Sequence, residues 1–166
     1  MKLCKLLTLV LLFMMTLINA KTADAAGVKD YGALSVSGTQ LVSKESGEKV
    51  VLRGVSTHGI NWDVGYPYIS KDAFKTLRDN YGVNAIRLAM YTTEYYGYCD
   101  KGSASDSQDR VRKTLKSRID TGVNAATDLD MYVIVDWHVL NDQDPNKYKK
   151  EAKAFFKEMS NKYAGQ

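Results

Sequence analysis

Two histidines, an arginine, a tyrosine and a tryptophan are the side chains of this sequence best suited to chemistry. They are His58, Arg87, Tyr91, Trp137 and His138, and each stands near the end of a short apolar run. The carboxyl ends of parallel strands meet at one edge of a sheet, where α/β proteins build their sites. A single histidine beside a strand is commonly structural, but the joint placement of all five predicts a functional site at that edge.

Arg87 stands between Ile86 and Leu88 in one of these apolar runs. A buried guanidinium must meet an anion, because an unpaired charge is costly in an apolar interior. Asp136 and Glu94 are the candidate partners for a local salt bridge. Alternatively, Arg87 keeps a catalytic carboxylate ionised by lowering the pKa of that carboxyl.

Aromatic side chains fill the loops that follow the first two runs. The rings are Trp62, Tyr66, Tyr68, Tyr91, Tyr95, Tyr96 and Tyr98. Rings at the rim of a site stack on the apolar faces of sugars, although any one of these tyrosines can equally pack its own loop. Asn61, Asp63 and Asn141 are neighbouring side chains that can bond hydroxyl groups. Together these residues favour a neutral saccharide over a phosphorylated ligand.

Strand and helix patterns alternate along the chain, which gives the α/β fold class. We expect a hairpin over 34–42, strands over 50–55, 83–90 and 131–135, and helices over 70–82, 111–123 and 144–165. The three strand runs are largely apolar, which predicts strands buried on both faces. This order of elements implies parallel strands joined by right-handed crossovers. The first strand-to-helix turn has neither the G-x-G-x-x-G fingerprint nor a Walker lysine, so a nucleotide-binding sheet is disfavoured.

Three residues and one dipeptide predict where the helices begin and end. Ser70 is suited to cap the first helix, and Gly82 to end it in the left-handed conformation. Asp144-Pro145 is suited to the Ncap and N1 positions of the last helix, and Gly165 to its end.

The composition is globular, with 166 residues, 45% hydrophobic, 25% charged and a net charge of +4. Residues 1–25 read as a secretory signal peptide, because Lys2 and Lys5 precede an apolar stretch shorter than the about 20 residues of a membrane span. We therefore expect a secreted, extracellular protein whose single domain covers 26–166, with no membrane segment after cleavage. Removal of the signal lowers the net charge to +2, which leaves no basic surface for nucleic acid.

The cysteines exclude two further classes of protein. Cys4 belongs to the expected signal peptide, so Cys99 alone remains in the mature chain. One cysteine supports neither a disulfide scaffold nor a metal site built from several thiolates.

Three segments resemble the first three strand-end motifs of the glycoside hydrolase family 5 endoglucanases. They are RGVSTHGINW at 53–62, NAIRLAMY at 84–91 and YVIVDWHVLND at 132–142. The resemblance implies a (β/α)8 TIM barrel, of which this chain carries the first three βα units after an N-terminal β-hairpin. It also implies hydrolysis of internal β-1,4-glucosidic bonds in cellulose or related glucans by a retaining mechanism, with no metal or organic cofactor.

The resemblance assigns roles to individual residues. The implied substrate-binding side chains are His58, Trp62, Asp63, Tyr91 and His138. Of these, the two histidines match cleft residues that bond glucose hydroxyls, and Asp63 stands in a first loop that is longer than in the shorter family members. Arg87 matches the arginine beside the nucleophile, so Arg87 and His138 are the implied supporting residues of catalysis.

One departure from the family pattern concerns the catalytic carboxylates. Retaining hydrolysis needs two carboxyl groups about 5 to 5.5 Å apart, and in family 5 these are glutamates that follow the fourth and seventh strands. We expect both to lie outside these 166 residues, which makes the chain the amino-terminal part of a secreted endoglucanase. The full-length enzyme is expected to be a monomer, and the fragment alone to be inactive, marginally stable and prone to aggregation.

Two other classes of protein stay open. A non-catalytic carbohydrate-binding protein can use the same aromatic rim without the glutamates. A small α/β hydrolase or metal-dependent deacetylase can use Asp136 with His58 and His138.

Overall fold

Three parallel strands form the centre of the computed structural model, which describes residues 26–100 and 107–165. They are β3 (Gly54–Ser56), β4 (Ala85–Tyr91) and β5 (Tyr132–His138), with β4 in the middle. The register pairs Arg87 with Ile134 and Tyr91 with His138. This arrangement confirms the predicted parallel α/β layer, whereas the expected signal peptide lies outside the described residues.

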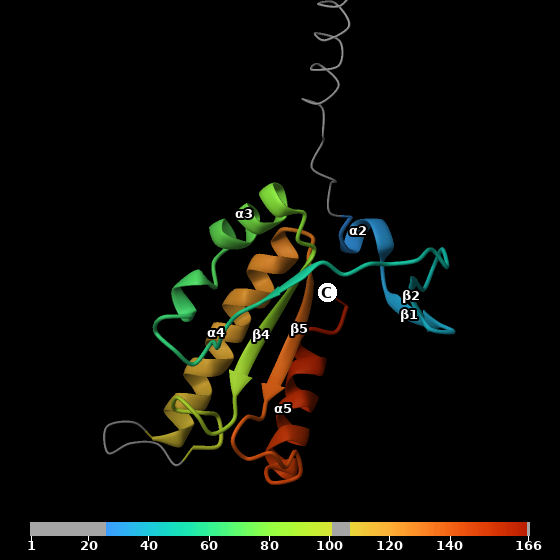
Figure 1. The fold of residues 1–166 in the computed structure, drawn as a ribbon. Coiled ribbons are helices and arrows are strands. Elements are labelled where there is room, and N and C mark those ends of the chain that lie inside the picture. The colour runs from blue at the N-terminus through green and yellow to red at the C-terminus, as the bar shows by residue number, and fades with distance from the viewer. Residues whose placement is uncertain (1–25, 101–106, 166) are drawn as a thin grey trace, which may run out of the picture.

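Three helices cover one side of this sheet. Figure 1 shows α4 (Gln108–Asp128) behind the two long strands, between α3 (Lys71–Tyr81) and α5 (Lys149–Lys162). The predicted ends of α3 are confirmed, because the Ser70 hydroxyl accepts a hydrogen bond from the amide of Ala73 and Gly82 is left-handed at φ 66°. No helix within the described residues is long and apolar enough to cross a membrane.

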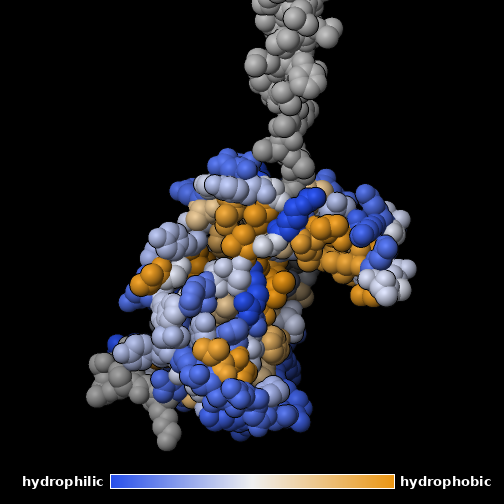
Figure 2. Space-filling view, in the orientation of Figure 1, coloured by the Kyte–Doolittle hydropathy of each residue, from blue (hydrophilic) through white to orange (hydrophobic). Residues whose placement is uncertain are grey.

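The hydrophobic core lies between the sheet and the helices. Alternate side chains of β4 point into it, namely Ile86, Leu88 and Met90. The opposite face of the sheet is turned toward the viewer in Figure 2, where hydrophilic and apolar side chains stand side by side. The strands therefore have one apolar face and one mixed face, and the mixed face is free for a site.

An N-terminal segment joins the sheet at the amino ends of its strands. It consists of α2 (Val28–Tyr31), which the sequence patterns did not predict, and the predicted hairpin of β1 (Leu34–Ser37) and β2 (Gln40–Ser43). The hairpin turns at Gly38, where φ is 59°. The Asn84 side chain attaches this segment to β4 by donating to the carbonyl of Ala26.

Two of the strands differ from the prediction. The expected buried strand over 50–55 is reduced to β3, whose three residues are exposed. Its only partner among the described residues is β4, so β3 is an edge strand with little cover. Among the described strands, β5 is the other edge strand and is only partly buried, whereas β4, with a neighbour on each side, is the one that matches the prediction of burial.

The last helix begins later than predicted. Asp144 does not cap α5, because its side chain accepts from the amide of Asn146 and forms a local turn. The Lys147 amide bonds the Asp144 carbonyl, and the helix starts at Lys149 with Tyr148 at its N-cap. Aspartate favours both such turns and N-caps, so the Asp-Pro pair by itself does not decide between them.

Candidate functional site

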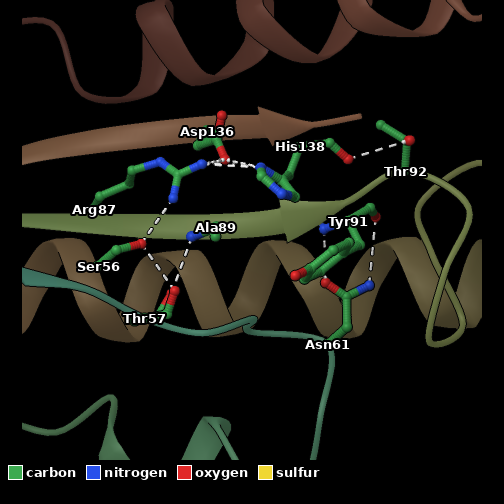
Figure 3. Close-up of polar contacts among 9 residues, drawn as sticks. All are labelled: Ser56, Thr57, Asn61, Arg87, Ala89, Tyr91, Thr92, Asp136 and His138. Carbon is green, nitrogen blue, oxygen red and sulfur yellow. Dashed lines mark hydrogen bonds and ion pairs between the residues drawn. The ribbon is translucent and has the colours of Figure 1, made fainter. Parts of the chain in front are cut away.

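A charged network of three side chains crosses the mixed face of the sheet near its carboxyl edge. The Arg87 guanidinium on β4 donates to the Asp136 carboxylate on β5 at 2.6 Å. The same nitrogen, Nη2, lies 2.9 Å from Nδ1 of His138, which lies 3.0 Å from the same Asp136 oxygen. Figure 3 shows the three side chains meeting above the strands. Asp136 is thus the anion that the position of Arg87 required.

The position of the hydrogen on the His138 ring decides which hydrogen bonds this network makes. Nδ1 carries one hydrogen at most in the neutral ring, so it either donates to Asp136 or accepts from Arg87. When it accepts, the hydrogen lies on Nε2 and is free to bond a ligand. A second guanidinium nitrogen of Arg87 donates to the hydroxyl of Ser56 at 2.8 Å, which fixes the plane of the guanidinium. Glu94, the other predicted partner of Arg87, accepts instead from the backbone of Asn141.

A row of aromatic rings lies beside the charged network. Trp62 stands next to His58, with ring centroids 4.3 Å apart, and Tyr91 next to His138, with centroids 4.7 Å apart. Tyr95 joins the two pairs, because its ring meets Trp62 at 3.9 Å and Tyr91 at 5.3 Å, edge to face in both cases. Burial, followed by the nearby Tyr95 and Glu94, raises the pKa of Tyr91. Tyr91 therefore keeps its phenolic hydrogen at neutral pH and can donate it.

Backbone bonds to β4 hold the loop that carries His58 and Trp62. The Thr57 amide donates to the carbonyl of Arg87, and the Ile60 amide to that of Ala89, both at 2.9 Å. Gly59 lies so close to Tyr91 that a Cβ there would stand 2.6 Å from the ring. Glycine at this position lets the loop approach the tyrosine.

Asn61 has a different role from the predicted one. Asn61 is 9% exposed, and its side chain accepts from the Tyr91 amide at 2.9 Å and donates to the Tyr91 carbonyl at 3.4 Å. These bonds occupy the groups that were expected to meet sugar hydroxyls. Asn61 therefore holds the backbone of Tyr91 in place. Its neighbours in sequence do not predict this role, because Tyr91 comes next to Asn61 only in the folded chain.

Two other predicted residues lie apart from the row of rings. Trp137 points to the opposite face of the sheet, where its ring packs against Tyr98 and Phe155 in the core. Successive side chains of β5 point to opposite faces, so Asp136 and His138 lie on one face and Trp137 on the other. The same alternation predicts this from the sequence, provided that the strand is taken to continue to His138. The Asp63 side chain is 97% exposed and pairs with Arg118 of α4 instead of facing the rings.

The structure brings together most of the predicted site residues. His58, Trp62, Arg87, Tyr91 and His138 line one edge of the sheet, and Asp136 and Tyr95 join them. Ser56 and Arg118 were not predicted, because a serine inside a motif and an arginine on the polar side of a helix carry no distinctive pattern. Among the described residues, no group of three or more His, Cys, Asp or Glu is placed to hold a metal ion.

These features define a parallel α/β protein whose site, at the carboxyl ends of the strands, combines aromatic rings with hydrogen-bonding and charged groups. Residues 43–166 match the family model for cellulase, glycosyl hydrolase family 5. The chain belongs to this family.

Curated relatives and solved structures agree with the assignment. The chain is 55% identical over 137 residues to Endoglucanase A of Butyrivibrio fibrisolvens, covering 82% of this chain and 30% of the relative. It is 40% identical to an endoglucanase of Clostridium saccharobutylicum, covering 92% of this chain and 31% of the relative. The catalytic domain of Thermobifida fusca endoglucanase Cel5A is 34% identical with a TM-score of 0.70, covering 84% of this chain and 41% of that one. The chain thus spans about a third of the length of the curated relatives it matches.

Proposed function

We propose that this chain is the amino-terminal part of an endo-β-1,4-glucanase that hydrolyses internal bonds of cellulose or related β-glucans. The observation that carries the proposal is the row of rings beside the Arg87–Asp136 pair in a family 5 chain. The names of the relatives, which are endoglucanases, support the substrate class. The share of their length that the chain spans supports a larger (β/α)8 barrel, to which the three described strands contribute.

In this proposal the described residues bind and orient the glucan. Trp62 stacks on a sugar face, and His58, Tyr91 and His138 bond its hydroxyls. Asp63 contacts the glucan only if its exposed side chain turns away from Arg118. Arg87 supplies positive charge beside the place where a nucleophilic carboxylate stands, and His138 supports it from the neighbouring strand.

The two catalytic carboxyl groups of the retaining mechanism belong, in this proposal, to parts of the enzyme outside these 166 residues. Asp136 is a poor substitute, because its Oδ2 already meets both Arg87 and His138. Glu158 bonds Lys116 of α4 in the helical layer, away from the mixed face. We further propose export through the signal at 1–25, a monomeric full-length enzyme that works outside the cell, and no dependence on a cofactor.

The test uses the native product, by which we mean the protein as the source organism makes it. Its intact mass is compared with that of the segment 26–166, and its activity is measured on carboxymethyl-cellulose as new reducing ends and falling viscosity. We expect a much heavier protein that cleaves internally. Trp62→Ala should raise KM by about tenfold through lost stacking, whereas Tyr68→Ala, an exposed tyrosine in the same loop, should not.

A carbohydrate-binding protein without catalysis is the second candidate, favoured by the engagement of Asp136 with Arg87. Glucan binding without new reducing ends, together with a mass that matches 26–166, would establish this alternative. A native product that neither binds nor cleaves a glucan would overturn both candidate functions.

A further inference from the structure

Arg118 reaches from helix α4 into the loop that carries His58 and Trp62. Its side chain is 15% exposed, and its Nη1 donates to two consecutive carbonyls, Ile60 and Asn61, at 2.8 Å each. Both hydrogens of that nitrogen are thereby used. Such charge-assisted bonds are about twice as strong as neutral ones, and the planar fork of arginine fixes their direction.

Two further contacts complete the grip of Arg118 on the loop. The guanidinium carbon lies 4.3 Å from the centre of the Tyr66 ring, within the range of a cation–π interaction. Nη2 lies 3.2 Å from Asp63, but that carboxylate is 97% exposed, so the ion pair adds little. The two carbonyl bonds and the Tyr66 contact therefore carry the interaction.

These contacts hold the chain on both sides of Trp62. Ile60 and Asn61 precede it directly, and Tyr66 follows in η1 (Tyr66–Tyr68), with its amide bonded to the Trp62 carbonyl at 2.8 Å. A hollow of about 340 Å³ adjoins Trp62 and Arg118. Without the guanidinium the loop loses the partners of two carbonyls and gains space in which the indole can move.

We propose that Arg118 is a positioning residue that fixes the loop around Trp62 and so holds the indole in place for sugar stacking. The inference rests on the proposed function, since stacking on a glucan is the purpose it assigns to Trp62. Arg118 lies on the helical side of this loop and acts on the ligand only through it.

The test compares Arg118→Ala and Arg118→Lys in the native product with Arg112→Ala as the matched control. Arg112 lies on the same helix, donates to the Tyr98 carbonyl and stands 5.0 Å from the Tyr98 ring, whose neighbours are Trp137 and Phe155 in the core. Removing it costs a comparable interaction away from the row of rings. We expect Arg118→Ala to raise KM about fivefold on soluble cello-oligosaccharides with kcat within about twofold, because uniform binding is lost.

Arg118→Lys should recover part of the lost affinity, since an ammonium can bond a carbonyl but lacks the fork. Arg112→Ala should lower thermal stability and leave KM unchanged. In a Trp62→Ala background, Arg118→Ala should change KM by less than about twofold, because two residues that act through one contact are not additive. An equal effect of Arg118→Ala with and without Trp62, or an unchanged KM, would overturn the inference.

Hydrogen exchange of the loop 57–69 separates this inference from the proposed function, because it needs no ligand. We expect faster exchange there in Arg118→Ala than in Arg112→Ala. If the native product neither binds nor cleaves a glucan, the proposed function fails, and exchange still decides whether Arg118 fixes the loop. If Arg118→Ala does not fold, Arg118→Lys carries both measurements, and unchanged exchange and KM in that variant would overturn the inference.

Discussion

Asn84 is expected to contribute about 3 kcal/mol to the free energy of unfolding, although it lies far from the site. It stands just before β4 with 2% of its surface exposed. Its side chain accepts from the amide of Arg53 at 2.7 Å and donates to the carbonyls of Ala26 at 3.0 Å and Val51 at 3.1 Å. One amide therefore joins three stretches of chain that are distant in sequence.

Replacing Asn84 by alanine removes all three bonds. A net contribution of about 1 kcal/mol for each gives a loss of about 3 kcal/mol in the free energy of unfolding. Urea unfolding of the native product measures this loss as a lower midpoint at unchanged slope. KM should stay within about twofold, because Asn84 lies at the end of β4 opposite to Tyr91 and the loss is one of stability.

Asn124→Ala is the matched control, because Asn124 is an exposed asparagine on α4. It should change the free energy of unfolding by less than about 0.5 kcal/mol. A loss below about 1 kcal/mol for Asn84→Ala would refute the reasoning, since it would mean that the freed backbone groups find water at no cost.

Three further predictions concern the charged network and the thiol. Asp136→Asn should lower kcat/KM of the native product by about tenfold or more, because it leaves the Arg87 charge without its carboxylate and alters which hydrogen His138 carries; Asp109→Asn, at the start of α4, is the control, and equal activity of the two variants would contradict the role of the network. Burial raises the pKa of Cys99 to about 11, so a thiol reagent at pH 8 should label Cys99 far more slowly in the folded protein than in urea, with Cys99→Ser identifying the signal. The unfolded thiol ionises near its ordinary pKa and binds fewer protons above it, so the stability contributed by Cys99 should be present below about pH 9 and be lost as the pH rises toward 11; a midpoint of unfolding that falls equally in Cys99→Ser would show that another group is responsible.

The residues that hold the site in place are different from those that face a ligand, so substitutions in the two groups should have different effects. The charged network stands on the mixed face of the sheet, whereas His58 and Trp62 stand on a loop that β4 and α4 hold by hydrogen bonds. A substitution in the support, such as at Asn61, is therefore expected to act on the site through Tyr91 without contacting a ligand.

The sequence by itself determined the features that depend on near neighbours along the chain. Ser70 and Gly82 predicted the ends of α3, because capping and left-handed turns are decided within a few residues. The hairpin over 34–42 was likewise predicted from near neighbours along the chain, and its turn falls at Gly38. The alternation of strands and helices predicted the parallel sheet, and with it the common edge where His58, Tyr91 and His138 meet.

Only the tertiary structure decided which partners these side chains take. Asp136 rather than Glu94 pairs with Arg87, since the register of β4 and β5 places the two on one face. Asn61 is used inside the fold, and Arg118 crosses from a helix to a loop 57 residues away in sequence. Such contacts depend on packing between elements that are distant in sequence. The periodicity of a sequence predicts which face of an element a side chain is on, but not which residue of another element it contacts.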